Sequence, residues 1–273
     1  MDLVVFDLDG TLLNAQSQIS DYTNRVLNKM AEAGIAYTVA TGRTLHGAHA
    51  VVSGSGFHLP HIIKNGVLIW NPASGDYSRQ CLLTQEEISK VLLAFTDAGV
   101  SPFIHTFEPN EHHGAYHAPV MKDYEHKLAA FIERERGSAL KPLSAMPPKA
   151  PIANFSGLGS QEAIDAIVAQ IAQEEHLIAY GGPAFEGQNL YWLDVHHCDG
   201  NKGAAVLELK RDVGAERIIC FGDSDNDLTM FEIADECYAP DNAKPEVKAV
   251  ATKVIGHHDD DGIARFLEAR FKL

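Results

Sequence analysis

Short apolar runs alternate with amphipathic stretches at both ends of the chain. Residues 3–6 are four consecutive apolar side chains and predict a strand buried on both faces, as in a parallel sheet. A helix is expected over residues 21–33, because apolar side chains recur on one stripe after Ser20, a suitable N-cap. A second strand is expected over residues 35–40. The opening of the chain therefore reads as strand, helix, strand.

The last third of the chain repeats this order. The expected elements are helices over residues 202–213, 225–233, 244–251 and 261–271, and strands over residues 217–221 and 237–239. Later in the first third of the chain, Asn65-Gly66 separates two short apolar runs and indicates a hairpin. Strands that alternate with helices favour an α/β fold with a doubly wound, mostly parallel, Rossmann-like sheet.

The middle of the chain has a different pattern. Thr84 and Glu87 form a capping-box signature for a helix that extends to about residue 98. Further expected elements are strands over residues 101–107, 152–155, 176–180 and 190–195, helices over residues 120–136 and 161–175, and a proline-rich surface loop over residues 141–151. We therefore expect an α/β core formed by residues 1–83 and 196–273, into which an α+β module, residues 84–195, is inserted.

Composition excludes several classes of protein. The chain has 273 residues, of which 45% are hydrophobic and 22% are charged, as in ordinary globular proteins rather than disordered ones. A net charge of −15 disfavours a nucleic-acid partner, because an acidic surface repels phosphate backbones. No apolar run reaches the roughly 20 residues of a membrane span, and the first residues lack the basic start of a signal peptide.

Cysteine usage agrees with a reducing compartment. The four cysteines lie far apart in the sequence and include no CxxC pair, so neither a disulfide framework nor a structural zinc site is expected. Together with the absence of a signal-peptide pattern, this indicates a cytoplasmic protein.

Two carboxylates follow the first expected strand. Asp7 and Asp9 are two residues apart and project to the same side, while Gly10 permits a sharp turn and Thr11 adds a hydroxyl group. Carboxylates this close repel unless a cation lies between them or one is protonated, and oxygen ligands suit Mg²⁺. The alternative interpretation is an ordinary polar exit from a strand.

A second acidic group follows the expected strand over residues 217–221. Asp223, Asp225 and Asp227 lie within five positions, together with Asn226. An acidic helix N-terminus would account for one of these aspartates but poorly for three. Because ligands in open α/β sheets lie beyond the carboxyl ends of strands, the two acidic strand ends predict a shared metal site.

Two further motifs are unspecific when taken alone. Thr41-Gly42-Arg43 follows the second expected strand, where a hydroxyl group and backbone N–H groups could bind a phosphoryl oxygen or could simply begin a helix. Lys202 opens an expected helix and could be ordinary solvated surface. Arg43 could reach a substrate or cap a helix, and we favour the structural role.

In this order and spacing, the four motifs resemble those of the haloacid dehalogenase superfamily of phosphotransferases. The opening DLDGTLL, the TGR, the Asn65-Gly66 and the long insertion before Lys202 resemble the Cof-type branch, subfamily IIB, which carries a C2-type cap. The resemblance covers residues 1–83 and 196–273, whereas the inserted module matches only in size, position and order of elements.

The resemblance implies a role for each motif residue. Asp7 would be the nucleophile that forms an aspartyl-phosphate, and Asp9 would be the general acid and then the general base. Asp227 would orient Lys202 or a metal-bound water. Mg²⁺ would be held by Asp7, the backbone carbonyl of Asp9 and Asp223, and the phosphoryl oxygens would contact Leu8 N–H, Thr41, Gly42 N–H, Lys202 and Asn226.

The implied function is a Mg²⁺-dependent phosphatase for a small phosphorylated metabolite, such as a sugar phosphate or a phosphorylated cofactor. The inserted module would exclude water and select the leaving group. A phosphomutase or another phosphotransferase on the same fold is an alternative, as is a non-catalytic regulatory protein. Release of inorganic phosphate, as opposed to isomerisation of the substrate, separates the first two readings.

The inserted module offers few clear signals. The chain has fourteen histidines, and a group of them with neighbouring acids could form a second metal site or a substrate loop; we favour an exposed polar loop. That group consists of His105, His112, His113 and His117 with Glu108 and Glu111.

Four more residues, two in the module and two where the chain returns to the core, remain to be placed. His196 and His197 could line the cleft between module and core or act as a hinge. Tyr191 and Trp192 are expected in the core of a sheet rather than on a stacking surface.

Overall fold

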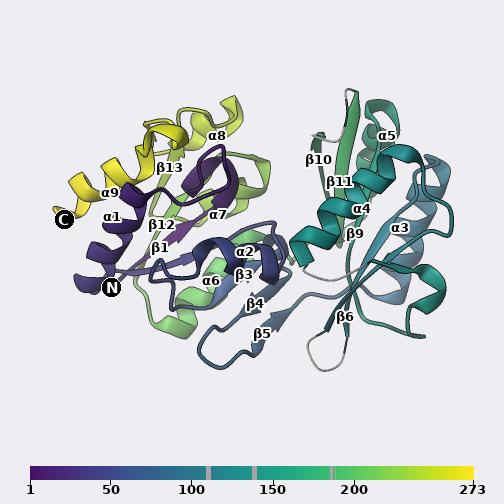
Figure 1. Cartoon of the computed structure of the whole chain (residues 1–273), viewed down its shortest axis with the longest axis horizontal. Coiled ribbons are helices and arrows are strands. Elements are labelled where there is room, and N and C mark those ends of the chain that lie inside the picture. The colour runs from purple at the N-terminus through teal and green to yellow at the C-terminus, as the bar shows by residue number, and fades with distance from the viewer. Residues whose placement is uncertain (109–111, 137–139, 185–186, 188) are drawn as a thin grey trace. The chain divides into compact units, whose positions relative to one another are not determined.

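The computed structural model describes residues 1–108, 112–136, 140–184, 187 and 189–273 (Figure 1). They form two compact units: unit 1 comprises Met1–Arg79 and Gly200–Leu273, and unit 2 comprises Gln80–Asp199. The sequence analysis placed the return to the core after residue 195, whereas the chain returns to unit 1 after Asp199. The reason is that β11 (Leu190–His197) continues to His197, which pairs with Leu177 in unit 2.

The centre of unit 1 is a five-stranded sheet in the order β14-β13-β12-β1-β2. Every neighbouring pair of its strands is parallel. Its strands are β1 (Asp2–Phe6), β2 (Ala36–Val39), β12 (Arg217–Phe221), β13 (Glu236–Pro240) and β14 (Lys253–Ile255). The predicted α/β fold with a parallel sheet is confirmed. Within the sheet, β1 lies between β2 and β12.

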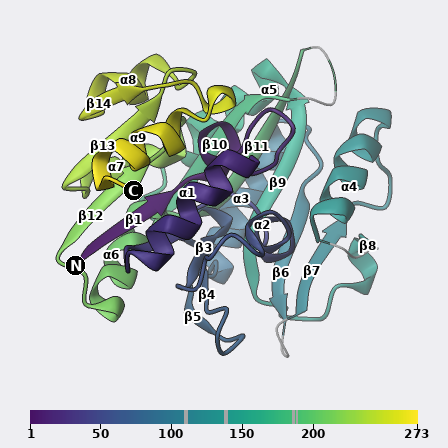
Figure 2. The ribbon, with the colours of Figure 1, turned by 60° about the vertical axis from the view of Figure 1, so that its left-hand side comes forward.

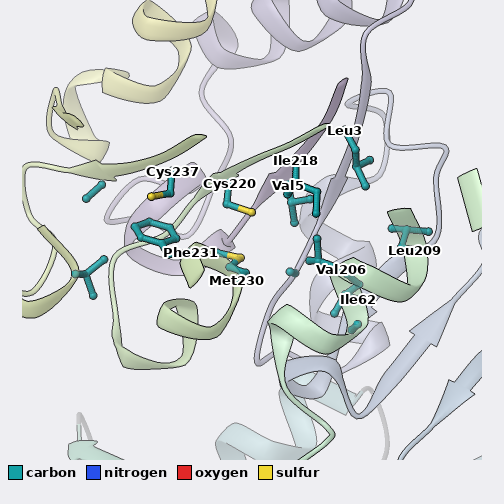
Figure 3. Close-up of a cluster of buried hydrophobic side chains, with 14 of the residues drawn as sticks. Leu3, Val5, Ile62, Val206, Leu209, Ile218, Cys220, Met230, Phe231 and Cys237 are labelled. Atoms are coloured by element: carbon teal, nitrogen blue, oxygen red, sulfur yellow. The ribbon is translucent and has the colours of Figure 1, made fainter. Parts of the chain in front are cut away.

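Helices cover both faces of this sheet. The helices of unit 1 are α1 (Asp21–Glu32), α2 (Leu45–Val52), α6 (Lys202–Val213), α7 (Leu228–Glu232), α8 (Pro245–Val250) and α9 (Gly262–Phe271). On one face, alternate residues of β1 and β12 pack with α6 and α7 (Figure 3). On the other face, Phe221 contacts Phe266 of α9, and α9 contacts α1 (Figure 2).

A small sheet extends the edge of unit 1 beside β2. It contains β3 (His61–Ile63), β4 (Leu68–Trp70) and β5 (Tyr77–Gln80) in that order. The antiparallel β3–β4 pair confirms the hairpin predicted around Asn65-Gly66. A parallel bridge between Ala40 and Ile62 aligns the end of β3 with the end of β2. Asn65, which has a positive φ of 55°, therefore follows a strand end at the same edge as Thr41.

Unit 2 contains a six-stranded sheet in the order β10-β11-β9-β6-β7-β8. It is antiparallel except for the short β7–β8 pair. Besides β11, its strands are β6 (Phe103–Glu108), β7 (His112–His117), β8 (Lys141–Pro142), β9 (Ile152–Ser160) and β10 (Leu177–Pro183).

Among the residues that the structure describes, three helices complete unit 2, namely α3 (Gln85–Asp97), α4 (Asp123–Arg136) and α5 (Gln161–Ile171). Ile104 packs in one hydrophobic cluster with α3 and α5, whereas its neighbour Phe103 packs in another with α4. Because successive side chains of a strand point to opposite faces, α4 covers one face of the sheet and the other two helices cover the second.

Several elements differ from the sequence expectations. The helix expected over residues 225–233 is a 3₁₀ turn, Asp225–Asp227, followed by α7, because the Asp227 side chain turns back to cap the first residues. The helix α2 and the strands β5, β7, β8 and β14 were not expected, and they are short or weakly patterned. The strand β8 and a 3₁₀ turn, Leu143–Ala145, lie within the expected proline-rich loop.

The histidine-rich segment is not an exposed loop. His105 is buried in β6, where its Nε2 lies 2.7 Å from Ser156 Oγ, and β6 pairs with β7 from His112 to Tyr116. Glu108 accepts hydrogen bonds from Thr106 and Tyr116, so these polar groups satisfy one another within the hairpin. Glu111 lies outside the described residues.

Trp192 is not in the sheet core. Its side chain is 39% exposed, although Tyr191 packs partly against a core cluster. Neighbouring residues of β11 alternate between faces, and Trp192 lies on the face opposite to the core cluster with α3 and α5. Among the described helices, none is long and apolar enough to cross a membrane.

Candidate active site

The motifs singled out in the sequence meet at one edge of unit 1. Asp7 follows β1, Thr41 follows β2 and Asp223 follows β12, and these three strands are adjacent and parallel. The Asp7 N–H donates to the carbonyl of Phe221 at 2.9 Å, which ties the first two acidic strand ends together. The carboxyl ends of the parallel strands thus bring residues more than 200 positions apart into one site.

Lys202 is fully buried between two carboxylates. Its Nζ donates to Asp7 Oδ1 and to Asp227 Oδ1, each at 2.6 Å. Burial alone would lower the pKa of this ammonium group, but the charges of Asp227 and Asp7 outweigh burial and raise it. Lys202 opens α6 behind Asn201, whose side chain caps that helix. The residue is therefore a fixed positive charge rather than solvated surface.

Asp227 has both carboxylate oxygens occupied. Its Oδ2 accepts from the backbone N–H groups of Asp223 and Ser224, at 2.8 and 3.0 Å, while Oδ1 holds Lys202. Gly222 makes room for this arrangement, because a Cβ at that position would lie 2.5 Å from the Asp227 Cβ. Asp227 orients both the turn that carries Asp223 and the ammonium group that faces Asp7.

Asp223 shares the site with Asp7. Its Oδ1 accepts from Thr11 Oγ1 at 3.0 Å, and its Oδ2 faces Gly10, where a Cβ would lie 2.7 Å away. Burial and the neighbouring Asp227 raise the pKa of Asp223 to about 6. Burial also raises the pKa of Asp7 well above its usual value; Lys202 opposes this, and Asp227 and Asp223 add to it.

The donor set fits a hard divalent cation. Oxygens of Asp7, Asp223 and Asp227 lie within 4.8 Å of one another, and Lys202 alone leaves two negative charges uncompensated when all three are ionised. Among the described residues, nothing donates to Oδ2 of Asp7 or of Asp223. Carboxylate oxygens are the ligands that Mg²⁺ prefers. A cation at Asp7 and Asp223 would relieve their repulsion and lower both pKa values.

The Asp9 side chain points elsewhere. Arg43 Nε and Nη2 donate to its two oxygens, at 2.7 and 2.6 Å, in a bidentate pair. The Asp9 side chain is 54% exposed and is not among the three clustered carboxylates. Arg43 does not cap α2, because Thr44 is its N-cap. The sequence analysis favoured a structural role for Arg43. In the structure Arg43 holds the Asp9 carboxylate, and its Nη1 donates to the Gly47 carbonyl of α2 at 3.3 Å.

Backbone N–H groups frame the same site. Among the described residues, no hydrogen bond engages the N–H of Leu8 or of Gly42. The Thr41 side chain is buried and accepts from the Arg43 N–H at 3.2 Å. A Cβ at Gly42 would lie 3.1 Å from Asn65 Oδ1, so this glycine permits a close approach. Two N–H groups and a positive charge are thus available to an anion next to Asp7.

Two residues of the site, Asn65 and Thr11, were given no role in it by the sequence analysis. Asn226 Nδ2 donates to Asn65 Oδ1 at 2.9 Å, and Ser224 Oγ donates to Asn226 Oδ1 at 2.8 Å. The sequence analysis took Asn65 as a turn residue and as part of the family resemblance, and it gave the Thr11 hydroxyl group no partner. Their roles depend on the Ala40–Ile62 bridge and on the adjacency of β1 and β12, which local patterns do not reveal. The signal available for Asn65 was that it, too, follows a short apolar strand.

Comparison with known proteins supports the fold and the family. The family model described as haloacid dehalogenase-like hydrolase matches residues 4–267. Pyridoxal phosphate phosphatase YbhA of Escherichia coli (strain K12) is 25% identical, and the alignment covers 97% of each chain. The 5-amino-6-(5-phospho-D-ribitylamino)uracil phosphatase YwtE of Bacillus subtilis (strain 168) is 27% identical, with 98% of this chain and 97% of that protein covered.

Solved structures agree at the level of the fold. A haloacid dehalogenase-like hydrolase from Bacteroides thetaiotaomicron superposes with a TM-score of 0.78 at 22% identity and covers 99% of both chains.

Proposed function

The chain belongs to the haloacid dehalogenase-like hydrolases, and from this premise we propose that it is a Mg²⁺-dependent phosphatase of a small phosphorylated metabolite. One observation carries the proposal: Lys202 lies buried between Asp7 and Asp227, with Asp223 beside them and unused N–H groups at Leu8 and Gly42. This combination supplies a nucleophile, a cation site and an anion site at one edge of one sheet.

Asp7 and Asp223 would hold Mg²⁺, with the backbone carbonyl of Asp9 as a third ligand. When bound, the ion offsets the charge of the carboxylates and the phosphoryl group, so that an anionic nucleophile can approach an anionic substrate. Asp227 is a less suitable ligand, because both its oxygens already accept hydrogen bonds.

In the first step, an Asp7 carboxylate oxygen attacks phosphorus and the bond from phosphorus to the ester oxygen breaks. The carboxyl proton of Asp9 goes to the leaving oxygen, and an aspartyl-phosphate forms. Lys202, the Leu8 and Gly42 N–H groups, Thr41 and Asn226 bind the phosphoryl oxygens and hold phosphorus in line with Asp7. Arg43, which holds the Asp9 carboxylate in the structure, would release it to the substrate.

In the second step, the Asp9 carboxylate takes a proton from water, and the resulting hydroxide attacks phosphorus. The bond from phosphorus to Asp7 breaks, which releases inorganic phosphate and restores the Asp7 carboxylate. Asp9 is left protonated for the next cycle. Water is the only co-reactant, and no oxidant or reductant is needed.

The proposed substrate class comes from the names of two relatives. Two relatives carry the names of small phosphorylated compounds, pyridoxal phosphate and a phosphorylated ribitylamino-uracil. A sugar phosphate or a phosphorylated cofactor is therefore our proposal, with unit 2 selecting the leaving group and excluding water. We also propose that the protein is cytoplasmic, on the cysteine usage described in the sequence analysis.

The test is phosphate release from p-nitrophenyl phosphate and a panel of phosphorylated metabolites, with Mg²⁺ and with EDTA. We expect Mg²⁺-dependent release that EDTA abolishes and that readdition of Mg²⁺ restores. Isomerised substrate without inorganic phosphate would indicate a mutase instead. Folded protein that releases no phosphate from any compound would contradict the proposal.

A further inference from the structure

Asn65 lies where the loops that carry the proposed phosphoryl-binding residues meet. It is buried, and its φ of 55° places it in the left-handed conformation, which asparagine tolerates better than most residues. Its N–H donates to the Thr41 carbonyl at 2.9 Å, and the Lys64 N–H donates to the Arg43 carbonyl at 3.0 Å. The 3₁₀ turn Lys64–Gly66 is therefore tied by its backbone to the loop after β2.

The last residue of this turn ties it to the start of α6. Gly66 lies against the backbone of Asn201, so closely that a Cβ at position 66 would overlap the Asn201 carbonyl. Asn201 caps the helix that begins with Lys202. The Gly66 carbonyl also accepts from Arg79 Nε at 2.9 Å. Asn65 is thus held between the loop after β2 and the helix that presents the buried ammonium group.

The Asn65 side chain contacts a third loop, the one after β12. Asn226 Nδ2 donates to Asn65 Oδ1 at 2.9 Å, and Ser224 Oγ donates to Asn226 Oδ1 at 2.8 Å. The two bonds fix both ends of the Asn226 carboxamide, because its oxygen meets a donor and its amino group meets an acceptor. Turned over, the carboxamide would place its own oxygen against that of Asn65.

The orientation of Asn226 decides what this residue offers to an anion. A carboxamide nitrogen carries two hydrogens, and among the described residues Asn226 Nδ2 donates to Asn65 alone. Asn65 Oδ1 lies beside Gly42, 3.1 Å from the position that a Cβ would take there. The Asn226 amino group is therefore brought near the unused Gly42 N–H, and its second hydrogen is available to the same anion.

We propose that Asn65 is a positioning residue of the phosphoryl site, which holds the Asn226 carboxamide with its N–H donor, and not its oxygen, toward the phosphoryl group. The role assigned to Asn65 rests on the proposed function and adds a residue to it. Among the described residues, Asn65 is bonded to neither Asp7 nor Asp223. Asn65 should therefore act on anion binding and leave Mg²⁺ binding intact, whereas a purely structural turn residue would affect both.

Calorimetric titration of the full-length, Mg²⁺-saturated protein with orthovanadate measures anion binding without turnover. Orthovanadate is the probe because it is an oxyanion with the tetrahedral shape of phosphate. Asn65→Gly removes the carboxamide and keeps a residue that adopts a positive φ. We expect its dissociation constant for orthovanadate to rise about 10–100-fold, because a hydrogen bond to a charged group is lost. Its dissociation constant for Mg²⁺, titrated separately, should stay unchanged.

Asn189→Gly is the matched control. Asn189 also has a positive φ, 62°, but it is exposed and belongs to unit 2, so this variant should bind orthovanadate like the wild type. Asn226→Ala should lose at least as much affinity as Asn65→Gly. The Asn65→Gly/Asn226→Ala double variant should lose no more than Asn226→Ala alone, because Asn65 acts through Asn226. A cooperative thermal transition shows that each variant is folded.

Three results would overturn the role of Asn65. They are unchanged orthovanadate binding in Asn65→Gly, losses that add up in the double variant, and an equal loss of Mg²⁺ affinity in Asn65→Gly. A wild type that binds no orthovanadate would overturn it as well. A wild type that binds orthovanadate but releases phosphate from no substrate would contradict the proposed function alone, and the same variants would still decide what Asn65 does.

Discussion

Lys202 is one ammonium group shared by two buried carboxylates. It contacts Asp7 and Asp227 at the same distance of 2.6 Å, and none of the three is more than slightly exposed. Removing one partner of a buried charge pair costs about 3–5 kcal/mol, because the other charge is left uncompensated. Since Asp227 would still hold Lys202 if Asp7 lost its charge, the two carboxylates can be tested separately.

The Asp7→Asn variant should lose activity without losing its fold. We expect phosphate release to fall by about 10⁴-fold or more, because an amide cannot form the aspartyl-phosphate. The thermal midpoint should stay near that of the wild type, since Asp227 keeps Lys202 paired. Asp225→Asn is the matched control, because Asp225 lies in the same acidic motif but forms an ion pair with Lys244 at the surface. Wild-type activity in Asp7→Asn would exclude Asp7 as the nucleophile.

The pKa of Asp223 predicts how pH acts on the metal-free protein. The folded value of about 6 lies above the ordinary 3.8, so the folded state binds the extra proton between these values. This proton contributes on the order of 2–3 kcal/mol to the free energy of unfolding. The contribution is fully present below about pH 4 and is lost as the pH rises through about 6. Urea unfolding across this range with EDTA measures it, and Asp223→Asn should flatten the slope.

Added Mg²⁺ should act in the opposite sense. It binds the ionised carboxylates, so the rise in thermal midpoint should be larger at about pH 7.5 than at about pH 5. An equal rise at both pH values would contradict a site built on Asp7 and Asp223.

At the scale of elements, the loop after β1 depends on a glycine. Gly10 has a φ of +76°, and a Cβ there would lie 2.7 Å from Asp223 Oδ2. Gly10→Ala should therefore both strain the backbone, by about 1–2 kcal/mol, and displace Asp223. Gly34→Ala is the control, because Gly34 has a similar φ of +71° with nothing within 4 Å of the added atom.

The two alanine variants should lose similar stability but differ in metal binding. Denaturant unfolding measures the first, and the Mg²⁺ concentration needed for half-maximal activity measures the second. We expect that concentration to rise about tenfold or more in Gly10→Ala and to stay unchanged in Gly34→Ala. Equal effects in both variants would mean that the glycine serves only the backbone.

Elements with clear end signals were predicted well. Residues 202–213 form α6 and residues 217–221 form β12 as expected, since Asn201 caps the helix and Gly214 ends it in a left-handed conformation. The helix α2 was missed although Thr44 caps it, because Gly47 and two histidines weaken its apolar pattern. Histidines also obscured β7, whose pairing with β6 is set by the hairpin rather than by local preference.

The site could be predicted only in part, because some of its contacts join segments that lie far apart in the sequence. Strand ends marked Asp7, Thr41 and Asp223, because position after an apolar run is a local signal. The partners of Thr11, Asn65 and Arg43 depend on contacts across the sheet edge and the loops. Such contacts are fixed by strand order, which a single sequence specifies only through the complete fold.

At the scale of the whole molecule, the described residues form two units. Hydrophobic clusters lie within unit 1 and within unit 2, and the carboxylates proposed for Mg²⁺ belong to unit 1 alone. Mg²⁺ binding should therefore stabilise unit 1 and leave the stability of unit 2 unchanged.

Hydrogen exchange measured by mass spectrometry tests this separation. Saturating Mg²⁺ should slow amide exchange in β1, β12 and the loops after them, and leave β9 and β11 unchanged. Exchange that slows equally in both units would contradict a Mg²⁺ site confined to unit 1. In the Asp7→Asn/Asp223→Asn double variant, Mg²⁺ should no longer slow exchange in unit 1.

The central claim is that Asp7 carries the phosphoryl group, and acid quenching of the Asp9→Asn variant tests it most directly. p-Nitrophenolate is a stable anion that leaves without a proton, so the first step should proceed while the second, which needs the Asp9 base, is slow. With Mg²⁺, we predict a burst of about one p-nitrophenolate per protein and one phosphoryl group on the peptide that contains Asp7. Turnover with no burst and no phosphoryl group on that peptide would contradict the account.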